Sequence, residues 1–194
     1  IIDIIPADVT PPAITIVSPA NLSYQDPAST LINITADEDL SWAGYQLNGG
    51  SILNLSNYSL SGWNITLTSL SQETTYNLTI YANDTSNNTN NKTAGFYADS
   101  LAPRYSSAQA DPSPANVSQN VNCSITWTDT YNITSVIIGE NSTDGFENHT
   151  INFSGTSGDA SYDISGAQFD GPNSYACKFY ATDAAGNMNT TTVS

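Results

Sequence analysis

Two ten-residue stretches of this chain decide its fold: TYNLTIYAND at residues 75–84 and SYACKFYATD at residues 174–183. Both alternate apolar and polar residues, as a strand with one buried face does, and they lie 99 positions apart. Two further pairs of segments match at a similar offset: PANLS (19–23) with PANVS (114–118), and LINITAD (31–37) with NCSITWTD (122–129). Three ordered matches at nearly one spacing predict two homologous domains of about 95 residues each.

The composition around these stretches favours strands over helices. The chain has 194 residues, a formal net charge of −15 and only 3 Lys and Arg residues. Asn, Ser and Thr supply the polarity, with 22, 25 and 23 residues, whereas only 4 Glu are present. Residues of this kind populate strands and turns rather than helix surfaces. We therefore expect an all-β protein that binds no nucleic acid, because it can form no basic patch, and does not insert into a membrane, because it has no long apolar run.

Short alternating runs recur about every ten residues in the first half of the chain, which is typical of a β-sandwich. The predicted strands are Ala13–Val17, Leu31–Ala36, Trp42–Leu47, Ile52–Leu55, Trp63–Leu67, Tyr76–Ala82 and Ala94–Tyr97. The pattern stops near Pro103, which predicts the domain boundary there. We expect an N-terminal apolar strand and linker at residues 1–9, a first domain at 10–99 and a second at 100–194.

The second domain resembles an immunoglobulin-like domain. Cys123 and Cys177 stand at inward positions of its second and sixth strands, and Tyr175 precedes Cys177 by two residues, where such sandwiches place a corner tyrosine. Both domains also look like the immunoglobulin-like repeats of bacterial and archaeal surface proteins, with Thr10-Pro11-Pro12 at the start and ATDAAGN (181–187) near the end. The resemblance covers nearly the whole chain. It implies two tandem immunoglobulin-like β-sandwich domains and an extracellular location rather than an activity.

In that setting the two cysteines, 54 positions apart, are better explained by a disulfide than by a metal site. The first domain departs from the pattern because it has no cysteine. Ile32 and Leu78 fall where Cys123 and Cys177 fall in the second domain. We expect a packed aliphatic pair to replace the disulfide there.

Acceptor motifs for N-glycosylation are unusually frequent. The chain has 16 Asn-x-Ser/Thr sequons, whereas its composition predicts about 5 by chance. The acceptor residues are Asn21, Asn33, Asn54, Asn57, Asn64, Asn77, Asn83, Asn87, Asn91, Asn116, Asn122, Asn132, Asn141, Asn148, Asn152 and Asn189. Where a sequon lies in a strand, its Asn and its Ser or Thr point outward together and the residue between them points inward. The excess predicts a densely glycosylated extracellular protein, with covalent N-glycans but no cofactor.

The N-terminal segment is the conspicuous apolar exception. Ile1, Ile2, Ile4 and Ile5 form a strand-like run that Pro6 ends. Residues 1–8 align with residues 92–99, so the run has the shape of the last strand of a preceding sandwich. The second domain shows the complement, because it stops 11 residues after Asp183, whereas the first continues 15 residues from Asp84 to Asp99. A sandwich without its closing strand exposes a sheet edge and core side chains.

The hypothesis that follows is donor-strand addition: residues 1–5 of one copy complete the second domain of the next, and copies join head-to-tail into a surface filament. Burial of Ile2 and Ile4 would contribute about 3–6 kcal/mol. Two alternatives stay open. The chain, which begins at Ile1 rather than Met, could be a piece of a longer surface protein in which the run ends an upstream domain, or the run could fray or fold back.

No convergent chemistry is evident in the sequence. We expect His149 to lie in a surface loop, and Glu38, Glu73, Glu140 and Glu147 to be scattered over turns. Acidic turns near Asp37, Asp84, Asp129 and Asp183 lack the spacing of a dedicated Ca²⁺ loop. Most of the aromatic residues, among them Trp42, Trp63 and Trp127, lie at inward or paired strand positions, so we expect core and sheet packing rather than sugar binding. The sequence therefore predicts a structural protein of a cell-surface appendage, with no catalytic residue and no metal site.

Overall fold

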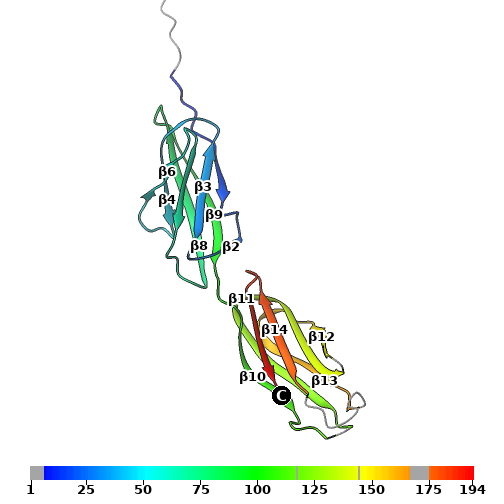
Figure 1. Cartoon of the computed structure of the whole chain (residues 1–194). Helices are drawn as coiled ribbons and strands as arrows, with labels where there is room; N and C mark the ends of the chain where they lie inside the picture. The colour runs from blue at the N-terminus through cyan, green and yellow to red at the C-terminus, as the bar shows by residue number, and fades with distance from the viewer. Residues whose placement is uncertain (1–6, 117, 144, 167–174) are drawn as a thin grey trace, which may run out of the picture. The chain divides into compact units, whose positions relative to one another are not determined.

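The structure is a computed structural model that describes residues 7–116, 118–143, 145–166 and 175–194. The chain divides into two compact units, unit 1 (Ile1–Ser100) and unit 2 (Leu101–Ser194), and both are built from strands (Figure 1). Among the described residues there is no helix with the length and apolar character needed to cross a membrane. The predicted all-β, immunoglobulin-like architecture is confirmed.

Unit 1 is a sandwich of two sheets. One sheet has the order β1-β3-β7-β6 and the other β2-β9-β8-β4-β5. The strands are β1 (Ile14–Ser18), β2 (Ser23–Gln25), β3 (Thr30–Ala36), β4 (Leu40–Leu47), β5 (Leu53–Asn54), β6 (Ser56–Asn57), β7 (Gly62–Leu67), β8 (Thr74–Asp84) and β9 (Thr89–Ala98). All seven predicted strands are found. The fourth predicted strand, Ile52–Leu55, contains β5 alone, and after buried Leu55 the chain continues into β6, which was not predicted and joins the other sheet.

The alternation that identified β8 builds the core of unit 1. Leu78, Ile80, Ala82 and Asp84 are buried, while the residues between them face outward. Ile32 and Leu78, predicted to replace the disulfide, are both fully buried in the same apolar cluster. The core of unit 1 is thus closed by apolar packing without a disulfide, and each fully buried aliphatic side chain contributes about 1.5–3 kcal/mol.

The sequence pattern did not reveal β2. After β1 pairs with β3, the chain crosses at Pro19–Leu22 to the other sheet. There β2 pairs in parallel with the end of β9, Ser23 opposite Phe96 and Gln25 opposite Ala98. Three half-buried residues carry no periodicity that could have predicted this strand. As a result β9 has a partner strand on each side.

Unit 2 repeats the plan with a longer central strand. Its strands are β10 (Arg104–Asp111), β11 (Val121–Thr143), β12 (Gly145–Ile151), β13 (Gly155–Ile164), β14 (Cys177–Asp183) and β15 (Met188–Val193). The first part of β11 pairs with β10 and β13, and its second part pairs with β12 and β14. The registers shift between Thr128 and Ile133. One strand therefore serves both layers of the sandwich.

The core of unit 2 surrounds the predicted disulfide. Cys123 and Cys177 are bonded, with Cα atoms 5.9 Å apart. Trp127, Ile138 and Phe179 are fully buried in the same cluster. Tyr175, the expected corner tyrosine, is buried and donates its hydroxyl to the carbonyl of Pro112. The bond closes a long loop of chain, which stabilises a small domain by about 4 kcal/mol.

Candidate interaction site at the last strand of unit 2

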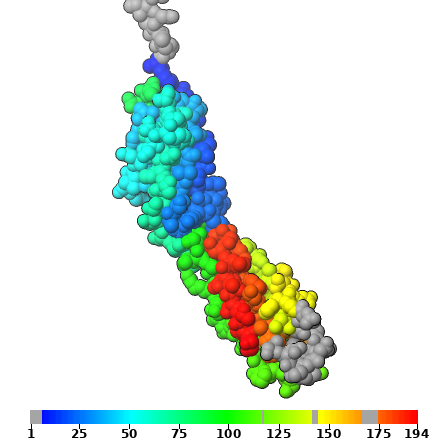
Figure 2. Space-filling view, in the orientation of Figure 1, coloured from blue at the N-terminus to red at the C-terminus, as the bar shows by residue number. Residues whose placement is uncertain are grey.

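The last strand of unit 2 is a sheet edge. β15 pairs with β14 from Met188 opposite Thr182 to Val193 opposite Cys177. Within the described residues of unit 2, no strand pairs with its other side. Figure 2 shows this strand, in red, on the surface of unit 2. An unpaired edge offers a row of backbone donors and acceptors to an added strand.

The corresponding strand of unit 1 gains a second partner only at its end, where Phe96–Ala98 pair with β2. β9 is ten residues long against six for β15, and it continues through Phe96 and Ala98, both fully buried. Phe96 stacks on Tyr76 at 5.3 Å between ring centroids. Tyr175 is the counterpart of Tyr76, because both lie two residues before the aligned positions Leu78 and Cys177. The counterpart of Phe96 would follow Ser194 directly, outside the printed sequence.

The two units also use their first strands differently. In unit 1 the chain leaves β1 and places β2 beside β9, whereas in unit 2 β10 stays on β11 as far as Asp111. The side chain of Asn189 donates to the carbonyl of Pro103 at 2.8 Å, which ties the start of β15 to the segment before β10. Further along, Val193 is only half-buried, while its counterpart Ala94 is 7% exposed. The open part of the edge is therefore its C-terminal half.

The predicted donor residues Ile1, Ile2, Ile4 and Ile5 lie outside the described residues. The next residues along the chain are placed at the start of unit 1. Asp8 accepts a hydrogen bond from the side chain of Asn88 through its carbonyl at 3.2 Å, and from the amide of Thr10 through its carboxylate at 3.0 Å. These two hydrogen bonds fix Asp8 at the start of unit 1.

The structure places all 16 sequon asparagines at the surface, and none is buried. Those at positions 21, 54, 57, 77, 87, 91, 116, 132, 148 and 152 are exposed, and those at 33, 64, 83, 122, 141 and 189 are half-buried. The side-chain amides of four of them donate hydrogen bonds among the described residues: Asn83 to Asn87 at 3.5 Å, Asn116 to Gln119 at 3.4 Å, Asn122 to Asp163 at 2.7 Å and Asn189 to the carbonyl of Pro103. Since the glycan attaches to that nitrogen, sequon accessibility is greatest among the exposed group.

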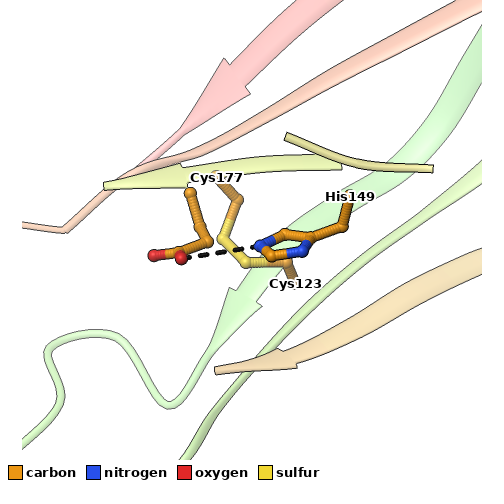
Figure 3. Close-up of polar contacts among 4 residues, drawn as sticks. Cys123, His149 and Cys177 are labelled. Carbon is orange, nitrogen blue, oxygen red and sulfur yellow. Dashed lines mark ion pairs between the residues drawn. A yellow bond between two sulfur atoms is a disulfide. The ribbon is translucent and has the colours of Figure 1, made fainter. Parts of the chain in front are cut away.

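The prediction that His149 lies in a surface loop is wrong. It lies in β12, stacked on Tyr162 at 3.7 Å, and its Nε2 is 3.6 Å from Oε1 of Glu140, whose side chain is fully buried. The register sets Glu140 opposite Cys177 and Tyr162 opposite Cys123, so the pair adjoins the disulfide (Figure 3). The four glutamates are not all scattered over turns either, because Glu147 lies opposite Glu140 and near His149. The sequence did not predict this pair, because the residues around Glu140, Glu147 and His149 resemble turns and loops, although they lie in β11 and β12.

An acidic group at the N-terminal end of unit 1 gathers Asp8, Glu38 and Asp84 within 4.8 Å. Burial, and then the charges of the surrounding carboxylates, raises the pKa of Glu38. Burial acts in the same direction on Asp84, but hydrogen bonds from Asn88 and Ser86 outweigh it and lower the pKa of Asp84. Asp84 accepts the Asn88 side chain at 2.7 Å and the Ser86 amide at 2.7 Å. These hydrogen bonds stabilise the charged form of Asp84 and hold the turn between β8 and β9, so Asp84 has a structural role.

The three tryptophans lie in different settings. Trp127 is fully buried and Trp63 packs against the core, as expected. Trp42, however, lies on the outer face of the sheet that contains β4, because Ala43 and Tyr45 take the inward positions. The alternation of β4 could have indicated this placement, since Trp42 and Gly44 share the parity of polar Gln46.

Comparison with known proteins adds little beyond the fold. No family model matches the chain, and no curated protein does. Among solved structures, an engineered protein is 23% identical, with a TM-score of 0.40 over 46% of this chain and 20% of that chain. Fibronectin(III)-like modules of Clostridium thermocellum CbhA are 16% identical, with a TM-score of 0.48 over 93% of this chain and 92% of theirs.

The Yersinia pseudotuberculosis adhesin InvE is 15% identical, with a TM-score of 0.35 over 93% of this chain and 58% of that chain. The chain thus spans about a fifth of the engineered protein and just over half of the adhesin. Identities and scores this low support no statement about function. The assignment of the fold rests on the strand order described above.

Proposed function

We propose that the protein is the structural subunit of an extracellular, N-glycosylated filament. Residues 1–5 of one copy add to the open edge of β15 in unit 2 of the next copy. The observation that carries the proposal is the outer side of β15, which no strand pairs with among the described residues, whereas the end of β9 in unit 1 (Phe96–Ala98) pairs with β2. The proposed role is structural and uses no catalytic residue.

Strand addition suits both partners. Backbone groups along β15 can pair with an added strand, which gives affinity. Alternate isoleucines of the donor, Ile2 and Ile4 or Ile1 and Ile5, would face the end of the core beside half-buried Val193 and buried Tyr175. Two buried isoleucines contribute about 3–6 kcal/mol before any backbone pairing.

The polymer that follows is open-ended. Donor and acceptor are different surfaces on different units, so the contact is heterologous, and it gives a fibre when its rotation does not close a ring. Surface sequons on both units would carry a coat of glycans along that fibre. The net charge of −15 further disfavours lateral association of bare surfaces.

A second candidate is a spacer or ligand-binding module of a longer cell-surface protein. The observation that favours it is the alignment of residues 1–8 with residues 92–99, in which Asp8 takes the place of Asp99 before a new domain. In that case residues 1–5 would close an upstream sandwich of the same polypeptide. The gene would then encode further domains, and the isolated chain would stay monomeric.

Imaging of the purified chain by electron microscopy tests the proposal. The full chain should form filaments, and deletion of residues 1–5 should abolish them. A matched variant carries residues 1–8 fused after Ser194 through a flexible linker, so that its own unit 2 is completed, and it should stay monomeric. Filaments that survive the deletion would refute donor-strand addition.

A further inference from the structure

We propose that the first sugar of an N-linked glycan on Asn91 packs against an aromatic platform formed by Trp42 and Tyr81 on the outer face of unit 1. The inference rests on the glycosylation within the proposed function, but not on filament formation. One of the 16 sequons would then carry a glycan that stabilises unit 1, in addition to covering its surface.

The register of the sheet brings the residues together. Asn54 of β5 lies opposite Gly44 of β4, Gly44 lies opposite Tyr81 of β8, and Tyr81 lies opposite Asn91 of β9. Residues directly opposite one another point to the same face, with Cβ atoms about 4.5–5.5 Å apart. A single row across β5, β4, β8 and β9 thus has a sequon asparagine at each end and Tyr81 beside Asn91.

Trp42 completes the row by lying over the glycine. A Cβ atom added to Gly44 would come within 2.5 Å of Cζ2 of Trp42, so only glycine leaves room for the indole there. The indole N–H donates to Oδ1 of Asn54 at 2.9 Å. The hydroxyl of Tyr81 donates to Oε1 of Gln46 at 3.0 Å. Both rings are therefore held on the sheet before any sugar arrives.

The platform is open enough for a sugar. A surface cavity of about 450 Å³ lies elsewhere in unit 1 under β5 and β7, but the hollow at the platform has about 360 Å³ and is lined by Trp42, Ile52, Tyr81, Asn83 and Asn91. Ile52 is 48% exposed, so the hollow is apolar on one side and amide-lined on the other. A pyranose ring, with C–H groups on its face and hydroxyls at its rim, matches that division.

Asn91 is the best placed of the three sequons around the hollow. It is exposed and directly opposite Tyr81. Asn83 is half-buried, and the side chain of Asn54 already holds the indole of Trp42. A glycan on Asn91 therefore needs no rearrangement of the strand to reach the aromatic rings.

The chain offers a matched control on the same two strands. The sequon Asn77-Leu78-Thr79 lies on β8, and Asn91-Lys92-Thr93 lies on β9. Thr79 and Thr93 are directly opposite one another, but Asn77 faces Gly95 whereas Asn91 faces Tyr81. Thr93→Ala and Thr79→Ala thus each abolish one sequon, and with it one glycan, by the same substitution at two neighbouring positions.

The experiment is a double-mutant cycle on the full chain from its glycosylating source, with site occupancy measured by mass spectrometry. Thr93→Ala should lower the thermal unfolding midpoint of unit 1 by about 4–8 °C. This is the shift expected when a small domain loses a stabilisation similar to that of one aromatic packing contact. In a Tyr81→Ala background the same change should have little effect. Thr79→Ala should have the same small effect with or without Tyr81.

The same variants made without glycosylation serve as the control for folding, and Thr93→Ala and Thr79→Ala should then be alike. An unmodified Asn91 in the native protein, or additive effects of Thr93→Ala and Tyr81→Ala, would overturn the inference. Filament imaging is a separate readout. If filaments are absent but Asn91 is modified and coupled to Tyr81, the glycan contact stands and donor-strand addition fails.

Discussion

Units 1 and 2 share the same β-sandwich plan but differ in what closes the core and in how the last strand ends. Unit 1 has an aliphatic pair, Ile32 and Leu78, at the positions of the disulfide of unit 2. Its last strand gains a second neighbour, β2, only at Phe96–Ala98, whereas β15 has one neighbour within the described residues. Unit 2 therefore combines a covalent bond in its centre with an unpaired edge on β15. The comparison teaches that the alternation shared by the two units builds the sandwich, while the closure of the core and the pairing at the end of the last strand differ between them.

The largest effect is expected at the closed edge. Phe96→Ala should cost unit 1 about 3–5 kcal/mol, because the ring is fully buried and stacks on Tyr76. In unit 2 the last apolar residue of β15 is Val193, and Val193→Ala should cost a chain without its donor strand about 1 kcal/mol or less, because Val193 is half-buried. Calorimetry of the chain lacking residues 1–5 resolves the two. Equal losses in both units would show that the two edges are closed alike.

Reduction of the disulfide should have a similar effect on the other unit. Opening the Cys123–Cys177 bond should lower the free energy of unfolding of unit 2 by about 4 kcal/mol. The transition of unit 1, which has no cysteine, should not move. The double variant Cys123→Ala/Cys177→Ala, which should not respond to the reductant, is the control. A reductant that shifts the unit 1 transition would mean that the units do not unfold independently.

The smallest effect concerns the acidic end of unit 1 and depends on pH. Because folding raises the pKa of Glu38, the folded state binds more protons than the unfolded state between the two pKa values, and stability falls as pH rises through that interval. The stability of the Glu38→Gln variant should therefore match that of the native chain below about pH 4, where residue 38 is uncharged in both proteins. At neutral pH the variant should unfold at a slightly higher temperature.

Asp84→Asn is the control of opposite sign. Folding lowers the pKa of Asp84, so its charge stabilises unit 1 at neutral pH, and that contribution is lost as pH falls through the folded-state pKa. Thermal melts across pH check both variants. If Glu38→Gln gives no gain at neutral pH, the carboxylates do not repel one another as their spacing indicates.

The sequence was sufficient to predict what depends on alternation. β8 and β14, the disulfide and the outward placement of strand sequons follow from inward and outward parity within single strands. It did not predict β2, because a three-residue strand is defined by its partner rather than by its own pattern. The Glu140–His149 pair and the row from Asn54 to Asn91 depend on register between strands. A one-residue slip would have placed each of these side chains on the opposite face, so a single strand read alone could not reveal them.

The central claim is that unit 2, and not unit 1, accepts the N-terminal strand. The most direct test adds a peptide of residues 1–8 to the chain that lacks residues 1–5 and follows the two unfolding transitions. A peptide with Ile2→Asp and Ile4→Asp is the control. The account predicts that the native peptide raises the unfolding midpoint of unit 2 increasingly, with the logarithm of its concentration above the dissociation constant, and leaves unit 1 unchanged. The control peptide should shift neither midpoint. No shift in unit 2, or a shift in unit 1 alone, would contradict it.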